Sequence, residues 1–227
     1  MIRSSSVMKE RLFFSSSLNG LIMEDLAMVR QFLMVFASAL AAGSASAADS
    51  FKIDTSASSV RWKGTKKIGS AHDGAISMKE GLVSFDAKGV LSSGRFVVDM
   101  STISNEDLKG TPDYQKKLVG HLSSPDFFDV AKYPTAEFKI TKVTPDPKNK
   151  NEMTLAGDFT MIGKTHPVSF PAKVSVVKGV ATGEATLKID RTKWGLKYGS
   201  GNFFKELAAD KIISDEFELT FKLVAKK

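Results

Sequence analysis

The sequence predicts an all-β fold, an antiparallel barrel with one short helical insert. From Val60 to the C-terminus, apolar residues recur at every second position, which is the period of strands with one buried face. In the last segment Ile213, Phe217, Leu219 and Phe221 share one side, and Asp215 interrupts it. Short connections rich in turn-forming residues separate the segments, and closure into a barrel leaves long hairpin strands without an open edge.

Residues 1–47 have a different pattern and are expected to lie outside the barrel. Met28 and the following arginine, the apolar run 32–42 and the tripeptide Ala45-Ser46-Ala47 form the three regions of a secretory signal, with cleavage after Ala47. The run is shorter than the roughly 20 residues of a membrane helix, so a permanent anchor is the weaker alternative. Met28 is the expected start codon. We predict one domain over 48–227, periplasmic or secreted.

Composition limits the possible functions. The chain has no cysteine, hence no disulfide, thiol nucleophile or lipid-modified cysteine. After cleavage, 28 basic and 22 acidic side chains leave a net charge of +6. The lysines are scattered over outward strand positions and loops, without a basic helix or stacking platform, so no nucleic-acid partner is expected. Transient contact with an anionic membrane surface remains open.

The strand candidates follow one another with short turns. They are Phe51–Ile53, Ser59–Gly64, Ala71–Met78, Gly81–Phe85, Val90–Asp99, Thr135–Val143, Glu152–Ile162, Val168–Val177, Val180–Asp190 and Lys211–Val224. The turns that contain Gly, Asn, Asp or Pro are 86–89, 145–151, 163–165 and 178–179. Successive hairpins of this kind predict antiparallel neighbours.

Two segments interrupt the alternation, and either is placed to cover a barrel mouth. Between Ser101 and Tyr133, leucines and a valine at helical spacing predict a short amphipathic helix that Pro112 opens. The second segment, Trp194–Ala209, has three glycines followed by apolar residues, which predicts a hinged loop with one helical turn. Trp194 either plugs the barrel end or lies along a ligand. The pair Phe127-Phe128 either anchors the first segment or forms a gate.

The inward face mixes large and small residues. The large ones are Trp62, Ile76, Phe96, Phe138, Phe159, Phe170, Leu187 and Phe217. The small ones are Gly64, Gly74, Gly94, Ala136, Gly157, Ala172, Gly183 and Ala185. Small residues in mid-barrel predict a hollow interior, whereas single strand glycines also mark bulges or sharp bends. A hollow apolar barrel suggests a carrier of apolar molecules.

Polar residues on the inward face are candidates for headgroup recognition. These are His72, Arg191 and Asp215, with Asp190 and Lys193 as further candidates. A guanidinium gives forked hydrogen bonds to phosphate, so Arg191 is the best anion partner, although an ion pair with either aspartate is equally compatible with the pattern. His72 either donates to a headgroup or is a hydrogen-bonded core histidine.

Catalysis and metal binding find little support in the sequence. His72, His121 and His166 lack the close spacing of zinc ligands, so neither a metal nor another cofactor is expected. There is no G-x-S-x-G motif and no carboxylate pair that the pattern brings together. We therefore predict that the protein is not an enzyme. The alternative is an enzyme that acts on a small apolar substrate with His72 and Asp215.

The chain resembles the YceI-like family through motifs spread over most of its length. They are Val60-x-Trp62-x-Gly64, His72-Asp73-Gly74, Gly81-x-Val83-x-Phe85, Asp99-Met100-Ser101-Thr102-Ile103, Leu122-Ser123-Ser124-Pro125-Asp126-Phe127, Gly157-Asp158-Phe159-Thr160-Met161-Ile162-Gly163-Lys164-Thr165-His166-Pro167, Ile189-Asp190-Arg191-x-x-Trp194-Gly195 and Ile213-Ser214-Asp215. The resemblance implies an eight-stranded antiparallel lipocalin-like barrel that encloses a polyisoprenoid or similar long-chain lipid tail, with its headgroup nearer the mouth.

The leading hypothesis is therefore a lipid carrier without catalysis. The predicted ligand-binding residues are Trp62, His72, Ile76, Phe96, Phe138, Gly157, Phe159, Phe170, Ala185, Arg191, Trp194, Asp215 and Phe217. A barrel with a filled core that serves envelope stress or interaction with other proteins is the second hypothesis. An exposed strand edge would also allow a homodimer.

Overall fold

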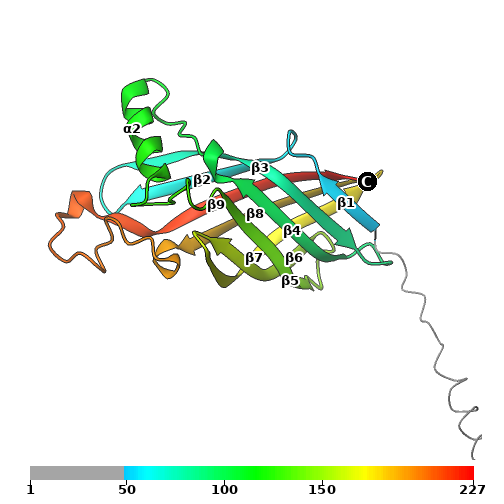
Figure 1. Cartoon of the computed structure of the whole chain (residues 1–227). Coiled ribbons are helices and arrows are strands. Elements are labelled where there is room, and N and C mark those ends of the chain that lie inside the picture. The colour runs from blue at the N-terminus through cyan, green and yellow to red at the C-terminus, as the bar shows by residue number, and fades with distance from the viewer. Residues whose placement is uncertain (1–48) are drawn as a thin grey trace, which may run out of the picture. The chain divides into compact units, whose positions relative to one another are not determined.

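The computed structural model describes residues 49–227, which form a β-barrel with one helix (Figure 1). The predicted signal and the proposed start at Met28 lie outside these residues. The strands are β1 (Asp49–Ile53), β2 (Ser59–Lys66), β3 (Ala71–Phe85), β4 (Leu91–Asp99), β5 (Thr135–Pro145), β6 (Glu152–Met161), β7 (Lys164–Val177), β8 (Val180–Asp190) and β9 (Ile213–Lys226). The helix α2 spans Pro112–Ser123, and the 3-10 turns η1, η2 and η3 span Met100–Thr102, Arg191–Trp194 and Ala209–Lys211.

The nine strands fill eight positions around the barrel. β1 and β2 both pair antiparallel with β3 and with β9, so they share one position and are separated by a short loop. The remaining neighbours run β9-β8-β7-β6-β5-β4, and the β3–β4 pairing closes the sheet. The eight-stranded antiparallel barrel predicted from the sequence is therefore confirmed.

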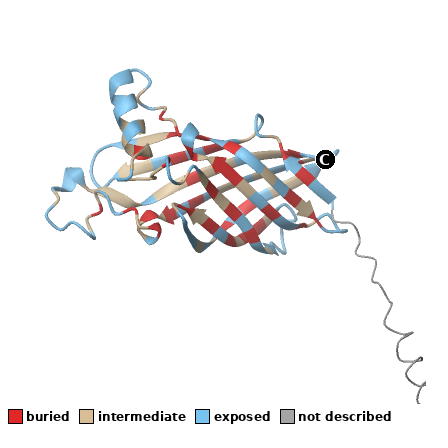
Figure 2. Cartoon of the chain, viewed as in Figure 1, coloured by how far each residue is buried: buried red, intermediate tan, exposed pale blue. Residues whose placement is uncertain are grey.

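Burial alternates along the strands, as the period of two predicts. In β6 the buried residues are Met153, Leu155, Gly157, Phe159 and Met161, with more exposed residues between them. Figure 2 shows the same alternation as red bands separated by blue and tan along the strands. One face of each strand thus forms the interior of the barrel, and the other face contacts solvent.

Two hairpin turns fix the register of β6, β7 and β8. Ile162 and Gly163 have φ of 44° and 71°, and Lys178 and Gly179 have φ of 49° and 77°. Two successive residues with positive φ are typical of the two-residue turns that match the twist of antiparallel strands. The turn predicted at 163–165 is therefore displaced, and β7 begins at Lys164 rather than at Val168.

Other predicted boundaries shift by a few residues. The candidates 71–78 and 81–85 form the single strand β3, and a register irregularity opposite β4 between Met78 and Glu80 accounts for the break in alternation. β9 begins at Ile213, because Lys211 belongs to η3. The helix begins at Pro112, as predicted.

The boundary between β7 and β8, hereafter the seam, lacks backbone pairing over much of its length. β7 and β8 pair only between Ala172–Val177 and Val180–Ala185, whereas 164–171 and 186–190 have no partners across the seam. The hairpin directs the N–H of Val177, and of every second residue before it, toward β8. Pro171 and Pro167 belong to this series and have no N–H to donate.

The seam is closed on the inside by side chains rather than by backbone hydrogen bonds. Phe170 of β7 and Leu187 and Ile189 of β8 are buried, with exposed fractions of 7%, 8% and 2%. Packing of these side chains replaces the missing hydrogen-bond ladder on this side of the barrel.

Candidate functional site

The barrel contains a cavity of about 610 Å³, hereafter the upper cavity. It extends from mid-barrel to the end that carries α2 and the loop 195–212, which lie at the left in Figure 1. Eight of the predicted ligand-binding residues line it: Trp62, His72, Ile76, Phe96, Phe138, Phe159, Arg191 and Phe217. The volume lies within the range of about 300–1,000 Å³ that is usual for small-molecule sites.

A smaller cavity of about 80 Å³, the lower cavity, lies toward the other end of the barrel. Phe170 and Ala185, also predicted, line this one. Five residues line both cavities and separate them: Phe96, Phe138, Phe159, Leu219 and Phe221. The rings of Phe96 and Phe138 are stacked with centroids 6.4 Å apart. The interior is therefore hollow, with an aromatic constriction in the middle.

The inward glycines divide into two groups. A Cβ added at Gly64 or Gly183 would meet no atom within 4 Å, and each residue lines one cavity. A Cβ at Gly74 would meet the carbonyl oxygen of Ser104, which accepts a hydrogen bond of 3.0 Å from Trp62 Nε1. The first group contributes empty space, whereas Gly74 permits a close approach of two backbone segments.

Gly157, one of the predicted ligand contacts, borders backbone and ring atoms of β5 rather than open space. Gly157 lines neither cavity, and a Cβ there would meet the Lys139 carbonyl oxygen and lie 2.6 Å from a ring carbon of Phe138. It pairs with Ile140 beside a register shift in β5. Gly157 thus follows the alternative interpretation, in which a strand glycine marks a bulge.

Arg191 reaches the wall of the upper cavity, but its guanidinium is bound to the backbone. Nε donates to Ser214 O at 3.0 Å, Nη1 to Leu196 O at 2.6 Å and Nη2 to Ile213 O at 3.2 Å. The side chain is buried, and burial lowers the pKa of Arg191 while the carboxylates of Asp215 and Asp190 oppose the shift. A forked contact with a ligand anion would have to break these bonds, so the geometry favours the structural role.

Asp215 also belongs to this structural cluster and does not line either cavity. Its Oδ2 accepts a hydrogen bond of 2.6 Å from Asn202 Nδ2. Oδ1 is buried without a hydrogen bond and lies 3.7 Å from Arg191 Nη2. Asp215 therefore connects the start of β9 to η2 through Arg191 and to the loop 195–212 through Asn202, and its predicted ligand contact is not supported.

His72 lines the upper cavity and is oriented by Asp107. Its Nδ1 lies 2.8 Å from Asp107 Oδ2, and the backbone N–H of Asp73 donates to Oδ1 at 3.0 Å. Burial raises the pKa of Asp107, but hydrogen bonds from Asp73, His72 and Asn105 together bring the pKa below its ordinary value. His72 and Asp215 thus have different partners, so the dyad of the enzyme hypothesis is not assembled.

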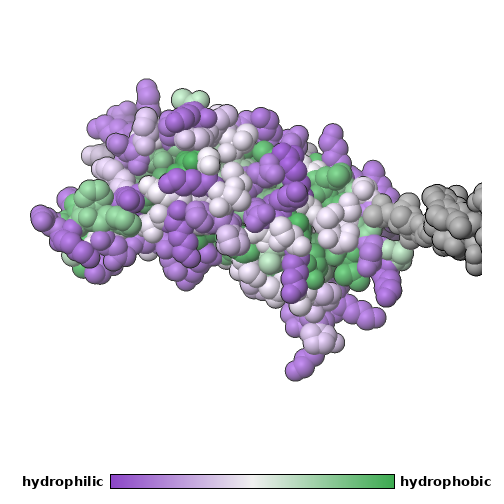
Figure 3. Space-filling view, turned by 60° about the horizontal axis from the view of Figure 1, so that its bottom comes forward, coloured by the Kyte–Doolittle hydropathy of each residue, from purple (hydrophilic) through white to green (hydrophobic). Residues whose placement is uncertain are grey.

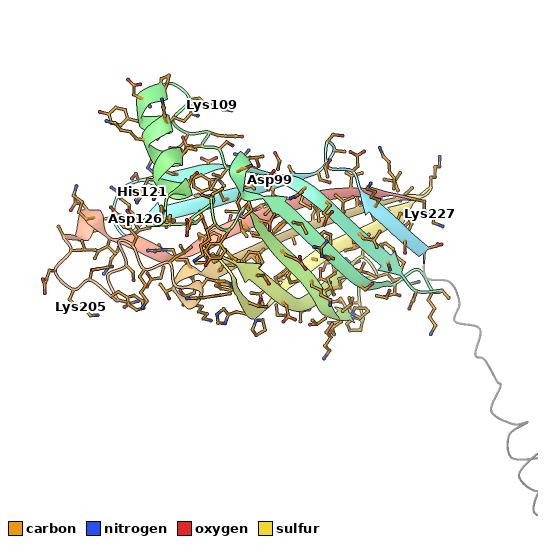
Figure 4. All side chains as sticks on the ribbon, viewed as in Figure 1. Asp99, Lys109, His121, Asp126, Lys205 and Lys227 are labelled. Carbon is orange, nitrogen blue, oxygen red and sulfur yellow. The ribbon has the colours of Figure 1, made fainter. Side chains whose placement is uncertain are left out.

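Sequence reasoning missed the polar groups at the mouth of the upper cavity. They come from the end of β2 and the β2–β3 connection, α2, the segment 195–212 and the start of β9: Lys66, Ser70, His121, Tyr198, Lys211 and Glu216. Figure 4 places His121 where α2 approaches the barrel end. The ring of His121 contacts those of Tyr198 and Phe127 at centroid distances of 4.5 and 5.4 Å. The periodicity stops in these loops, so it could not assign their side chains to the mouth.

The side chain of Trp194 is packed into the barrel wall and does not line either cavity. It is 1% exposed, and its Nε1 donates to Phe159 O at 3.2 Å. Its ring packs edge-on against Phe159 and His166. Of the two interpretations of Trp194, the structure therefore favours the plug.

No group of three or more His, Asp or Glu side chains in residues 49–227 is arranged to hold a metal ion. None of the helices in the same residues has the length and apolar character needed to cross a membrane.

The comparisons with known proteins agree with this architecture. The model of the YceI-like domain matches residues 51–225. The chain belongs to the YceI-like family. Among curated relatives, a UPF0312 protein of Vibrio cholerae is 30% identical over 100 residues, which are 44% of this chain and 48% of that protein. Protein YceI of Escherichia coli is 44% identical over 54 residues, 24% of this chain and 27% of that protein. The chain thus spans about half or less of these YceI-family relatives.

Solved structures of similar fold extend over more of the chain. BcnA of Burkholderia cenocepacia is 25% identical, with a TM-score of 0.59, and the match covers 77% of this chain and 99% of BcnA. A polyisoprenoid-binding domain from Saccharophagus degradans, implicated in plant cell wall breakdown, is 14% identical, with a TM-score of 0.54 over 78% of this chain and 97% of that domain. At that identity, the second match is evidence for the YceI-like fold alone.

Proposed function

We propose that this YceI-like protein is a carrier that holds a polyisoprenoid or similar long-chain lipid in the barrel without changing it chemically. The observation that supports the proposal most is the upper cavity of about 610 Å³, which is predominantly apolar inside and has polar groups at its mouth. The name of the S. degradans relative, a polyisoprenoid-binding domain, agrees with this class of ligand. The His72–Asp215 dyad of the enzyme hypothesis is not assembled in residues 49–227, because His72 pairs with Asp107 and Asp215 pairs with Asn202.

Burial of the tail supplies the affinity in this account. Each CH₂ transferred from water into an apolar site contributes about 0.8 kcal/mol. Phe96, Phe138, Phe159 and Phe221 surround the middle of the interior and offer aromatic contacts to a slim chain. A tail long enough to pass these rings enters the lower cavity.

The headgroup binds at the mouth, and its partners differ from those predicted from sequence. Lys66 and Lys211 provide ammonium groups there, and Ser70, His121 and Tyr198 provide groups able to donate hydrogen bonds. Glu216 also lines the cavity, so two ammonium groups stand against one carboxylate, and this balance favours an anionic or hydroxylated headgroup over a cationic one. Arg191 and Asp215 stabilise the loop 195–212 and the start of β9 next to the mouth, and they do not contact the headgroup.

A series of prenyl alcohols of increasing length tests the carrier proposal. Binding is measured by titration while tryptophan fluorescence is followed; of the two tryptophans, Trp62 lines the cavity and Trp194 does not. We expect the affinity to rise with each isoprene unit until the cavities are filled, because each unit buries further apolar surface. Affinity that does not depend on tail length would contradict the proposal.

The headgroup site is tested by comparing geranylgeranyl diphosphate with geranylgeraniol. Lys66→Gln and Lys211→Gln should weaken the diphosphate more than the alcohol, because only the diphosphate carries charge for the ammonium groups. Lys188→Gln, at an outward position of β8, is the matched control. Equal losses for both ligands would place the headgroup elsewhere. Export to the periplasm, based on the sequence pattern of residues 28–47, is part of the same proposal.

A further inference from the structure

Apolar side chains reach the protein surface around the mouth of the upper cavity. Ile68 is 59% exposed, and Tyr198, Phe203 and Phe204 are 46%, 47% and 49% exposed. They come from two adjacent loops, since the N–H of Lys67 donates to Ile212 O at 2.9 Å. Figure 3 shows green side chains among purple ones at the left, the same end as the loop 195–212 in Figure 1. We call these residues, 66–70 and 195–212, the mouth surface.

The mouth surface is continuous with the upper cavity. Tyr198, Phe204 and Leu207 line the cavity, and so do Lys66 and Lys211. Two of these side chains, those of Tyr198 and Phe204, are also among the exposed ones. A molecule that covers the mouth surface would therefore face the opening of the cavity.

The charge of the mouth surface is predominantly positive. Its five lysines are Lys66, Lys67, Lys197, Lys205 and Lys211, against only Glu206 and Asp210. One of the acids is already paired, because Lys211 Nζ lies 3.4 Å from Asp210 Oδ2. Lys197 Nζ lies 4.6 Å from the centre of the Phe203 ring. Aromatic rings bordered by lysines are typical of surfaces that lie in the headgroup region of an anionic bilayer.

We propose that the mouth surface docks onto an anionic phospholipid bilayer, so that the upper cavity opens against the membrane. This inference rests on the proposed carrier function and names the surface with which the carrier exchanges its lipid. The exposed rings insert at the acyl boundary, and the lysines contact phosphate groups. A lipid tail then passes from bilayer to barrel with little exposure to water.

The opposite end of the barrel provides a matched control. Val176 and Val177, beside the β7–β8 turn, are 41% and 63% exposed. They are apolar, exposed and distant in the fold from the mouth surface. Ile68 and Phe203 are exposed without lining either cavity, so their replacement alters the mouth surface and not the cavity wall.

Sedimentation with vesicles tests the proposal. The protein is mixed with vesicles of phosphatidylcholine, with or without phosphatidylglycerol. We expect binding only to the anionic vesicles, with a loss of at least tenfold for the double variant Ile68→Ser, Phe203→Ser and no loss for Val176→Ser, Val177→Ser. Lys205→Gln should weaken binding about fivefold, and higher salt should weaken it further.

Three outcomes would overturn the docking proposal. The first is no binding to anionic vesicles, and the second is an equal loss in the two double variants. The third is a shift of the wild-type protein to a dimer that Ile68→Ser, Phe203→Ser abolishes, since the mouth surface would then contact a second copy. Geranylgeraniol binding in vesicle-free solution is measured in parallel, so that failure of docking and failure of the carrier function are distinguished.

Discussion

Gly64→Leu is expected to remove lipid binding while preserving the barrel. Gly64 lies on the inward face of β2, lines the upper cavity and has open space where a Cβ would be. It pairs with His72 on β3 and with Phe217 on β9. A leucine side chain adds four carbon atoms to this space, so it displaces a similar part of the ligand.

The magnitude follows from the displaced apolar groups. At about 0.8 kcal/mol per CH₂, three to four displaced groups cost roughly 3 kcal/mol, which corresponds to a Kd raised about 100-fold. Stability should be maintained, because glycine within a strand is less favourable than a residue with a side chain. The added side chain occupies space that is otherwise empty.

The assay is titration with geranylgeraniol monitored by tryptophan fluorescence, together with urea unfolding of the same samples. Gly120→Leu is the matched control, because Gly120 lies on α2, is exposed and also has no atom within 4 Å of an added Cβ. Unchanged affinity in a folded Gly64→Leu protein would refute the reasoning. Equal losses in both variants would refute it as well.

Four further predictions concern stability and local opening. Gly157→Ala should destabilise the barrel by about 1–3 kcal/mol in urea unfolding, because the methyl group meets Lys139 O and the Phe138 ring; an unchanged midpoint would contradict this. Arg191→Ala should cost about 3–5 kcal/mol, because it removes the donor from three backbone carbonyl oxygens and the cation nearest the buried Oδ1 of Asp215. It should weaken neutral and anionic ligands equally, and a selective loss of anionic ligands would indicate direct contact. The folded state lowers the pKa of Asp107, so ionised Asp107 stabilises the folded protein above pH 3.8, and this stabilisation is lost as the pH falls through the lowered pKa. Asp107→Asn should therefore make the melting temperature less sensitive to acid, as measured by thermal unfolding at a series of pH values. The amides of Thr186 and Lys188, which point toward β7, should exchange hydrogen faster than those of Thr182 and Glu184, because only the latter pair with β7. The amides of Leu187 and Ile189 point toward β9 and should stay protected, and equal protection of all β7-facing amides would exclude an open seam.

The alternation of apolar residues was sufficient to predict the barrel. The alternation depends only on which face of each strand is buried, and the hairpin-turn residues indicate where the chain reverses direction. It did not predict that β1 and β2 share one position, because this depends on the length of β3, which pairs with both. The seam had a signal in the sequence, namely Pro167 and Pro171 at alternate positions of β7, but the predicted strand began at Val168 and left Pro167 outside it.

Site residues on regular strands were easier to predict than those in loops. Phe96, Phe138 and Phe159 lie on strands, and the pattern placed them inside correctly. Inward direction did not distinguish a glycine that leaves space from one that accommodates a neighbour, as Gly64 and Gly157 show. That difference depends on the opposing strand, where a register shift in β5 brings backbone close to Gly157.

The polar groups were the least predictable. The N–H groups of the Arg191 guanidinium can donate to phosphate oxygens or to carbonyl oxygens equally well, so its partners depend on the path of the loop 195–212. The structure folds that loop back so that Leu196 O, Ile213 O and Ser214 O accept its hydrogen bonds. Lysines on loops carry no periodic signal, so the cations of the mouth could be recognised only from the structure.

The most direct test of the carrier function is mass spectrometry of organic extracts from protein purified without detergent from the host periplasm. Gly64→Leu, purified in the same way, provides the comparison. The account predicts a stoichiometric long-chain lipid in the wild-type protein and its depletion in the variant. An empty wild-type barrel, or equal lipid in both proteins, would contradict it.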